Sequence, residues 1–276
     1  MKKLCIATAY DSQYGKLGNY TAASIQSYAD AFGYDARVIS TAEIEGRSTA
    51  WYRIQLIQEL FDEGFDWVLW IDADAIFLRH NIDILGQTEE GKDLYFVPEI
   101  GPLKYPYPPA PNTGVMLLRN SAWTRGLLAE LMDRGYYRHQ FPWEQGALWE
   151  LLGHFEALSR FDDTVKGPDQ VDEERYKKIK VLPKEWNAMF LFEDFRVENP
   201  IILHFAGQDP EKRHQAMMNH YLGSKEQDTD LVVKLQKLET EKKDLQRQLN
   251  RMTESPGYKI AMRVRRWFVP VVEKWK

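Results

Sequence analysis

The sequence predicts an α/β fold with a mainly parallel central sheet, followed by a helical C-terminal extension. Apolar runs such as Lys3–Ala9 and Asp66–Phe77 alternate with segments that have helical spacing. These runs lack polar alternation, which is typical of strands buried on both faces. The length of 276 residues and the hydrophobic share of 44% allow a sizeable core.

Each element follows from its own pattern. Strands are predicted at Lys3–Ala9, Val38–Ile39, the run before Asp72, Leu94–Val97 and Gly114–Leu118. Helices are predicted at Thr21–Phe32, Ser48–Glu63 and Ser121–Met132. Gly33 and Gly64 end the first two helices, and Ser121 is placed as the N-cap of the third. Alternation of this kind favours a parallel sheet with helices on both faces.

Composition excludes several classes of protein. The single cysteine, Cys5, rules out a disulfide framework and fits a reducing, cytoplasmic compartment. Lys3–Ala9 is too short for a signal peptide, and no run approaches the roughly 18 apolar residues of a membrane span. The mixed charges, with a net value of −5, give no reason to expect nucleic acid. Most of the nine tryptophans are expected in the core, and sugar stacking is the alternative.

Two carboxylates, Asp72 and Asp74, end an apolar strand and are separated by one small residue. Ionised carboxylates are costly in a core unless a cation accompanies them, and α/β sheets bind ligands at the carboxyl ends of strands. We therefore expect a divalent metal, Mg²⁺ or Mn²⁺, shared with a diphosphate. Because Asp-x-Asp is common, the alternative is that Asp72 caps a turn and Asp74 is solvated.

Further landmarks follow in a fixed order. They are Trp51–Ile54, Trp70–Phe77, Asn112–Trp123, Glu144–Gln145 and His204–Gly207. In this order they resemble the GMA12/MNN10-like galactosyl- and xylosyltransferase family, retaining enzymes with the GT-A (Rossmann-like) fold. The resemblance spans roughly residues 1–222 and implies a catalytic domain there that transfers a sugar from a nucleotide donor.

The resemblance implies the ligands of the metal. With Asp72 and Asp74, His204 corresponds to the family's third protein ligand, and an imidazole suits Mn²⁺ better than Mg²⁺. Taken alone, His204 would more often be a satisfied histidine at the end of a strand. Gly207 is expected to let backbone N–H groups approach a phosphate.

The resemblance also implies a donor site. Arg53 lies on the helix before the metal-binding strand, where the family carries a cation; the alternative is a surface cation on an amphipathic helix. Tyr10 is placed to stack on the nucleotide base, or is a core tyrosine. Asn112 and Gly114 are assigned to sugar contact, with a simple turn as the alternative. Ala73, between the two aspartates, belongs to the same site.

Phe141–Gln145 is predicted to begin a helix, with Pro142 in its first turn and Gly153 beyond its end. The family carries acidic residues followed by Gln at this point, near the reacting anomeric carbon. Here Trp143 replaces the first acidic residue. We expect Gln145 to face the anomeric centre and Glu144 to bind sugar or stabilise charge.

A second departure from the family follows the histidine. The family often has a lysine two residues after the glycine, poised on the diphosphate, and this chain has Asp209 there. Lys212 or Arg213, next along the chain, is expected to replace the missing cation, and Lys212 is our choice; a different pocket is the alternative.

The segment 223–253 is predicted as a linker and a short coiled coil or amphipathic helix. Apolar residues recur at four- and three-residue steps over 231–252, which indicates a homodimer seam or a helix packed on the body. The tail 254–276 is basic and aromatic. Over 258–276 such a composition suits an anionic membrane surface, with a partner-docking tail as the alternative.

The resulting hypothesis is a transfer from a UDP-sugar to a glycan or lipid-linked glycan in cell-surface polysaccharide synthesis, by a cytoplasmic enzyme at the inner face of the membrane. The choice of UDP over GDP rests on the family alone, and the sugar is open. Two alternatives stay open. An apolar strand ending in Asp-x-Asp also begins phosphatases of the haloacid-dehalogenase type, and an inactive sugar-binding scaffold would retain the same residues.

Overall fold

The computed structural model describes residues 2–99, 108–191, 197–224, 247 and 250. The chain divides into two compact units, Met1–Leu222 and Gly223–Lys276. The first unit contains nearly all of the described residues. The predicted coiled coil at 231–252 and the basic tail at 258–276 lie outside the described residues, apart from the helical positions 247 and 250. Among the described residues, no helix is long and apolar enough to cross a membrane.

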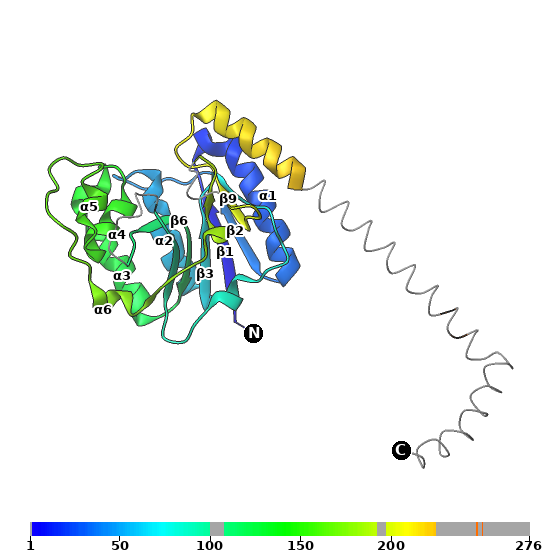
Figure 1. Cartoon of the computed structure of the whole chain (residues 1–276), viewed down its shortest axis with the longest axis horizontal. Coiled ribbons are helices and arrows are strands. Elements are labelled where there is room, and N and C mark those ends of the chain that lie inside the picture. Colours follow the sequence, from blue (N-terminus) through cyan, green and yellow to red (C-terminus); the bar gives the residue numbers. More distant parts are fainter. Residues whose placement is uncertain (1, 100–107, 192–196, 225–246, 248–249, 251–276) are drawn as a thin grey trace, which may run out of the picture. The chain divides into compact units, whose positions relative to one another are not determined.

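A six-stranded sheet forms the centre of this unit (Figure 1). Its strands lie in the order β2 (Asp35–Ile39), β1 (Leu4–Ala9), β3 (Trp67–Ile71), β6 (Pro111–Arg119), β5 (Leu94–Pro98) and β7 (Ile179–Val181). β1 is parallel to β2 and β3, and β5 is parallel to β7. β6 runs antiparallel to both of its neighbours. The predicted, mostly parallel α/β sheet is therefore confirmed, with β6 as the reversed strand.

Helices cover both faces of the sheet, as expected. They are α1 (Gly15–Phe32), α2 (Tyr52–Asp62), α3 (Ala122–Met132), α4 (Glu144–Leu152), α5 (Phe155–Leu158) and α6 (Glu173–Tyr176), and residues 210–224 form a further helix. Short 3-10 turns occur at Ser12–Tyr14, Thr49–Trp51, Ile84–Gln87, Gly135–Arg138 and Lys184–Trp186. The Ser121 hydroxyl accepts a hydrogen bond from the Thr124 N–H and caps α3, while Gly33 ends α1 in the left-handed conformation.

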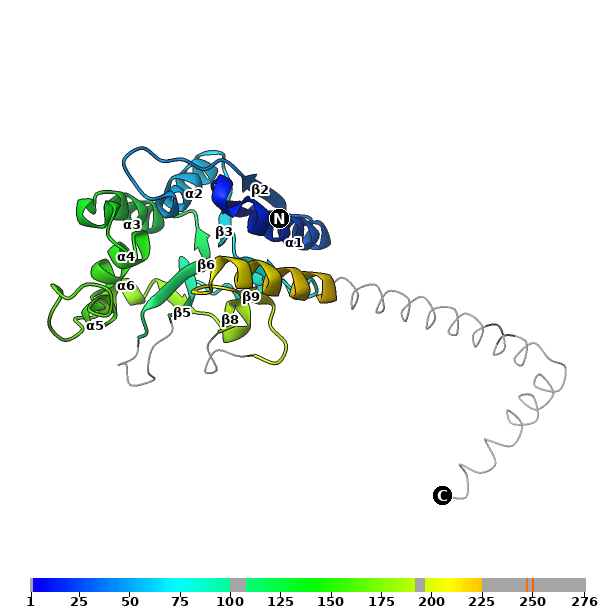
Figure 2. The ribbon, with the colours of Figure 1, turned by 90° about the horizontal axis from the view of Figure 1, so that it is seen from above.

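Two apolar clusters fill the two sides of the sheet. One joins α2, α3 and α4 to the sheet, and the other joins α1 to its opposite face. Figure 2 shows this division, with α2, α3 and α4 on one side of the sheet and α1 on the other. Trp51, Trp149 and Trp186 are fully buried, so these three tryptophans serve the core. Cys5 is buried as well, and burial raises the pKa of its thiol to about 12.

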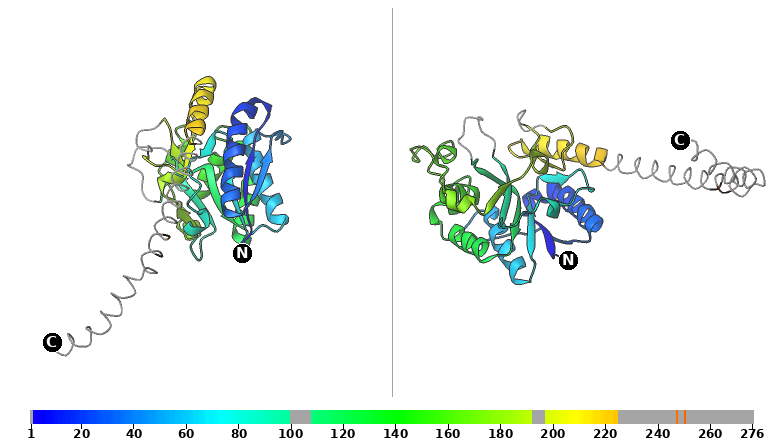
Figure 3. Two further views of the ribbon diagram at one scale, coloured as in Figure 1. Left: turned by 90° about the vertical axis from the view of Figure 1, so that its right-hand side faces the viewer. Right: turned by 60° about the horizontal axis from the view of Figure 1, so that its bottom comes forward.

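A smaller sheet lies beside the carboxyl end of β3 (Figure 3). It contains β4 (Ala75–Phe77), β9 (Ile202–His204) and β8 (Ala188–Met189), in that order. β4 pairs antiparallel with β9, so that Ala75 lies opposite His204, and β8 runs parallel to β9. Because only three residues separate β3 from β4, this pairing brings residues near position 204 beside residues 72–74.

Candidate active site

A cavity of about 770 Å³ opens at the edge of the main sheet where β1 and β3 end and β6 begins. Eleven of the twelve predicted site residues line it: Tyr10, Arg53, Asp72, Ala73, Asp74, Asn112, Gly114, Glu144, Gln145, His204 and Gly207. Lys212 is exposed and is not among the lining residues, whereas Arg213 is. The structure therefore gathers positions that are up to about 200 residues apart in the chain.

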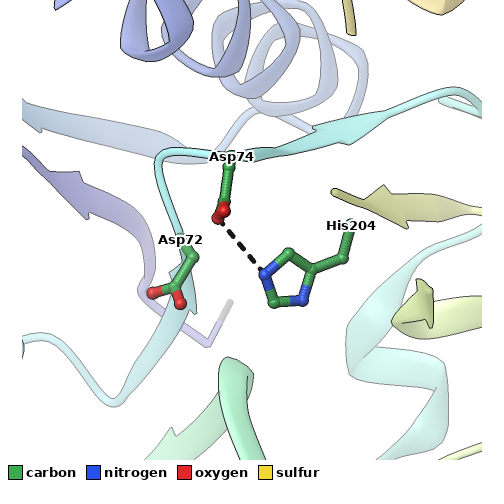
Figure 4. Close-up of side chains that lie close together, drawn as sticks. All are labelled: Asp72, Asp74 and His204. Atoms are coloured by element: carbon green, nitrogen blue, oxygen red, sulfur yellow. Dashed lines mark ion pairs between the residues drawn. The ribbon is translucent and has the colours of Figure 1, made fainter. Parts of the chain in front are cut away.

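Asp72, Asp74 and His204 form an acidic cluster in this cavity (Figure 4). One ligand atom from each lies within 4.8 Å of the others. Asp72 follows β3, Asp74 precedes β4, and His204 is the last residue of β9. The Phe205 N–H donates to the Asp74 carbonyl oxygen at 2.9 Å, which continues the β4–β9 ladder past the cluster. The two sheets therefore fix the backbone of all three residues.

The Asp74 side chain is buried, and each of its carboxylate oxygens has a partner. Its Oδ1 lies 3.2 Å from His204 Nε2, and its Oδ2 lies 2.9 Å from Arg213 Nη1. Burial by itself would raise the pKa of Asp74, but His204 and Arg213 outweigh it and the pKa is lowered. Burial alone would lower the pKa of His204, and the Asp74 carboxylate reverses this, so that the pKa of His204 is raised. The alternative of a solvated Asp74 is wrong.

The other nitrogen of His204 is held by a buried amide. Asn187 is completely buried, and its Oδ1 lies 2.9 Å from His204 Nδ1. Asn187 Nδ2 donates to Asn112 Oδ1 at 2.8 Å, and Asn112 Nδ2 donates to Glu99 Oε2 at 2.7 Å. Because Asn187 Nδ2 is the donor toward Asn112, Asn187 Oδ1 is the acceptor toward His204, which assigns the Nδ1 proton. The Nε2 atom is thereby directed at the carboxylates.

Gly114 has a steric role in this arrangement. A side chain at this position would overlap the His204 ring and would lie 3.0 Å from Asn112 Oδ1. The close approach that the sequence indicated at Gly114 is thus made by the histidine. Gly207 differs, because space is open around it and its φ of 75° is what favours glycine.

Arg53 is a buried cation between two carboxylates. Its Nη2 lies 3.0 Å from Asp72 Oδ1, and its Nε lies 3.1 Å from Glu144 Oε1. Nη1 donates to the carbonyl and hydroxyl oxygens of Thr113 at 2.7 and 3.0 Å. Asp72 also accepts from Trp70 Nε1 at 2.7 Å. The alternative in which Arg53 is a surface cation is therefore wrong, and so is a capping role for the Asp72 carboxylate.

Glu144 and Gln145 begin α4 and face the cavity. Glu144 Oε1 accepts from the Thr113 hydroxyl at 3.1 Å, and Gln145 Oε1 accepts from the Thr113 N–H at 2.9 Å. Burial raises the pKa of Glu144 to about 7, although Arg53 opposes this effect. Its Oε2 atom is buried without a hydrogen-bond partner among the described residues. A bound ligand would satisfy that oxygen.

The start of α4 differs from the sequence prediction. Pro142 precedes the helix, its peptide bond with Phe141 is cis, and Trp143 occupies the N-cap position. Trp143 has φ 55° and ψ −126°, because the chain turns sharply here and the Trp143 N–H donates to the Gln140 carbonyl. Gly153 ends α4 in the left-handed conformation, as predicted.

Tyr10 combines both interpretations offered by the sequence. It lines the cavity, yet it is buried, with its ring packed so closely on Gly18 of α1 that a side chain there would overlap it. Asn112 is buried too, and its Oδ1 accepts from the Gly114 N–H at 2.9 Å. The Ala73 carbonyl accepts from the Thr21 hydroxyl at 2.8 Å, which anchors the turn between the two aspartates on α1.

Sequence reasoning missed three polar residues that hold the predicted site residues in position. Glu99 follows β5, and a carboxylate at the end of an apolar strand is the same signal that marked Asp72. It accepts from Gln145 Nε2 at 3.1 Å as well as from Asn112. In the sequence, Thr113 was marked only by its place within the Asn112–Trp123 landmark, between Asn112 and Gly114. Asn187 lies between a 3-10 turn and a two-residue strand, where no local pattern marks it.

The cluster fits a divalent metal by its chemistry. It offers two carboxylate oxygens and an imidazole nitrogen whose second nitrogen is fixed by an amide. Such mixed oxygen and nitrogen ligands suit ions of the Mn²⁺ type. In metal sites generally, the ring nitrogen of a histidine ligand that does not bind the metal makes a hydrogen bond to a neighbouring group. Arg53 and Arg213 partly balance the two carboxylates.

Comparison with known proteins identifies the class. The model of the nucleotide-diphospho-sugar transferase family matches residues 34–218, which include the cluster, the start of α4 and His204. The chain therefore belongs to this family of nucleotide-diphospho-sugar transferases. A search of curated proteins found no match.

Solved structures share the fold. A glycosyltransferase involved in glycosylation of the major capsid of PBCV-1 has 16% sequence identity and a TM-score of 0.58, with 78% of this chain and 98% of that chain covered. The apo form of the bifunctional glycosyltransferase WbbM has 15% identity and a TM-score of 0.50, over 80% of this chain and 50% of that one. The apo form of GlyE from Streptococcus pneumoniae TIGR4 has 15% identity and a TM-score of 0.50, over 80% and 61%. The fold is thus the GT-A glycosyltransferase fold.

Asn187 is expected to control metal affinity through His204. In Asn187→Ala the imidazole loses the acceptor for its Nδ1 proton, so Mn²⁺ affinity measured by isothermal titration calorimetry should fall about 10–100-fold. Asn120→Ala is the matched control, because Asn120 donates to the Phe61 and Phe65 carbonyls and does not line the cavity. Equal Mn²⁺ affinity in wild type and in a folded Asn187→Ala variant would contradict this role.

Proposed function

We propose that this chain is a retaining, metal-dependent glycosyltransferase of the GMA12/MNN10-like type. It moves a hexose or pentose from a nucleotide-sugar, with UDP as the preferred carrier, to a glycan or lipid-linked glycan acceptor of cell-surface polysaccharide. The main support for this proposal is that the Asp72–Asp74–His204 cluster and the Glu144–Gln145 pair line the same cavity. The family and the fold support transfer from a nucleotide-sugar.

The cluster side of the cavity would hold the diphosphate. When bound, Mn²⁺ or Mg²⁺ at Asp72, Asp74 and His204 would neutralise charge on the leaving diphosphate as a Lewis acid. Arg213 reaches the same place, and its Nε atom is buried without a hydrogen-bond partner among the described residues. Its guanidinium can donate to a phosphate oxygen, which Lys212 on the exposed surface does not approach. We assign the predicted cation role to Arg213 in place of Lys212.

The pair at the start of α4 would hold the donor sugar. Gln145 is fixed by Thr113 and Glu99, so its amide has a set orientation toward the cavity. Glu144 is fixed by Arg53 and Thr113, and its second oxygen is available to a hydroxyl group. Its raised pKa makes it a weaker nucleophile than an ordinary carboxylate near neutral pH.

Retention of configuration would then follow from reaction on one face of the sugar. The bond between the anomeric carbon and the phosphate oxygen breaks, an oxocarbenium-like ion pair forms, and the acceptor oxygen bonds to the same face. The departing phosphate oxygen takes the acceptor's proton. Glu144 and Gln145 stabilise the positive charge at the anomeric centre and form no bond to it.

The C-terminal segments complete the proposal. Association of two chains through 231–252 and contact of 258–276 with an anionic membrane surface would place the enzyme beside a lipid-linked acceptor. The basic excess of 251–276, with seven basic and two acidic residues, supports such contact.

Nucleotide binding is the first test. In a thermal-shift panel of UDP, GDP and CMP with Mn²⁺, we expect UDP to stabilise wild type by about 2.7 kcal/mol at ~100 times its Kd, and only with metal. Asp74→Ala should abolish this stabilisation. The matched control is Asp93→Ala, which removes a buried carboxylate that pairs with Arg119 and Lys178 and does not line the cavity. Absence of metal-dependent stabilisation by any nucleotide would overturn the proposed function.

Neighbouring cations provide the second test. Arg213→Ala should weaken binding of the nucleotide diphosphate about tenfold or more, because a charge-assisted hydrogen bond is worth roughly 1.5–3 kcal/mol. Lys212→Ala changes an exposed cation one residue away and should leave the Kd within about twofold. Calorimetric titration with UDP and Mn²⁺ distinguishes the two variants. A larger effect of Lys212→Ala would restore the original assignment.

The stereochemical proposal is tested on Glu144. Nuclear magnetic resonance of the product should show the same anomeric configuration as the donor. Mass spectrometry of the enzyme quenched during turnover should show no glycosyl group on the peptide that contains Glu144, because the ion-pair route forms no such ester. A trapped glycosyl-Glu144 ester would instead establish a double displacement.

A further inference from the structure

Three aromatic side chains line one flank of the cavity. We refer to Phe141, Trp143 and Phe161 as the aromatic wall. Phe141 is 47% exposed and Phe161 is 40% exposed, which is high for phenylalanine in a domain whose other large apolar residues are mostly buried. Exposed apolar surface that borders a cavity commonly marks a binding site.

The wall is a packed structure and its rings support one another. Phe141 contacts Trp143 edge to face, with ring centroids 4.9 Å apart, and contacts Phe161 at 5.1 Å. The ring of Trp149, which is fully buried, packs on Phe161 with the ring centroids 5.9 Å apart. The rings are therefore held by ordinary aromatic packing on a core residue, while part of their surface stays open to the cavity.

Trp143 adds an independent observation. Its φ of 55° and ψ of −126° are disfavoured for every residue except glycine, and such a backbone costs roughly 1–3 kcal/mol. A glycine at position 143 would relieve this strain, but it would also remove one of the three rings of the wall. A strained residue that also lines a cavity is a candidate for a role in that site.

The wall lies at the α4–α5 end of the unit. Phe141 and Trp143 precede α4, and Phe161 follows α5. Figures 1 and 2 show α4 and α5 on the opposite side of the unit from α1 and β2. The Glu144–Gln145 pair adjoins the wall in sequence and lines the same cavity. The three rings carry no charge, so they suit a neutral ligand.

We propose that the aromatic wall binds the acceptor as a pyranose ring. The C–H groups on one face of a pyranose form an apolar surface that packs on aromatic rings, while its hydroxyl groups remain free to hydrogen-bond. A sugar seated on Phe141 and Phe161 places its hydroxyl groups beside Glu144 and Gln145, where the proposed function puts the anomeric carbon. This inference rests on that function and names the chemistry of its acceptor subsite.

The test uses the full chain with UDP and Mg²⁺, a diamagnetic ion that permits saturation-transfer nuclear magnetic resonance. The probes are methyl β-D-glucopyranoside, methyl β-D-galactopyranoside and methyl α-D-mannopyranoside. We expect at least one of them to receive saturation from the wild-type protein, chiefly at its axial ring protons. Phe161→Ala should reduce that signal about three- to tenfold, as expected for the loss of one aromatic contact. Phe161→Tyr should preserve the signal because it keeps the ring.

Leu222→Ala is the matched control. Leu222 is more exposed than either phenylalanine of the wall, at 51%, and it does not line the cavity. Its removal should leave the pyranoside signal unchanged, and melting temperatures establish that each variant is folded. Equal signals in Phe161→Ala and wild type, or no signal from any probe, would overturn the acceptor subsite.

Nucleotide affinity distinguishes failure of this inference from failure of the proposed function. UDP binding in Phe161→Ala should stay within about twofold of wild type, because an uncharged ring cannot pair with a diphosphate. A much weaker UDP affinity in Phe161→Ala would assign the wall to the donor and overturn the inference. If UDP binds wild type with metal but the wall variants bind every pyranoside as wild type does, the function stands and only the acceptor subsite falls.

Discussion

The buried ion pairs of Arg53 hold the two halves of the site together. Arg53 lies on α2 and contacts Asp72 at the end of β3, Thr113 on β6 and Glu144 at the start of α4. The pKa of Arg53 is raised, because its two carboxylate partners outweigh the effect of burial, so it stays charged. Removing one partner of a buried pair typically costs about 3–5 kcal/mol, since the other charge is left uncompensated. Arg53 is therefore one of the connections that set the spacing between the acidic cluster and the start of α4.

A second connection runs through neutral groups. His204 bonds to Asn187, Asn187 to Asn112, and Asn112 to Glu99, which also accepts from Gln145. The acidic cluster and the start of α4 are thus linked twice, once by charges through Arg53 and once by the hydrogen-bonded amides. Hydrogen bonds of this kind give rigid side-chain orientation, which a site needs when a misplacement of an ångström is costly.

The cavity divides between two kinds of interaction. Carboxylates, an imidazole and Arg213 surround the region assigned to the diphosphate, where charge changes during the reaction. The aromatic wall lines the flank beyond Glu144, where a neutral sugar would need apolar contact. In the proposed transfer, Trp143 extends the wall where the resemblance led us to expect an acidic residue, and the neighbouring Glu144 provides the carboxyl group.

The sequence by itself determined five of the six strands of the main sheet, helices α1 to α4 and the aspartate pair of the acidic cluster. His204 was added to that cluster only through the family resemblance. Local patterns were sufficient for Ser121 as the cap of α3, for Gly33 and Gly153 as helix ends and for the strand before Asp72, because these depend on a few neighbouring residues. Only the tertiary structure decided that β6 is reversed, that Arg213 and not Lys212 reaches the cavity, and that Asn187 holds His204. Each of these depends on strand pairing, or on contacts between residues that are distant in the chain. Periodicity and spacing in the sequence do not predict such contacts, because these contacts form only when the elements pack together.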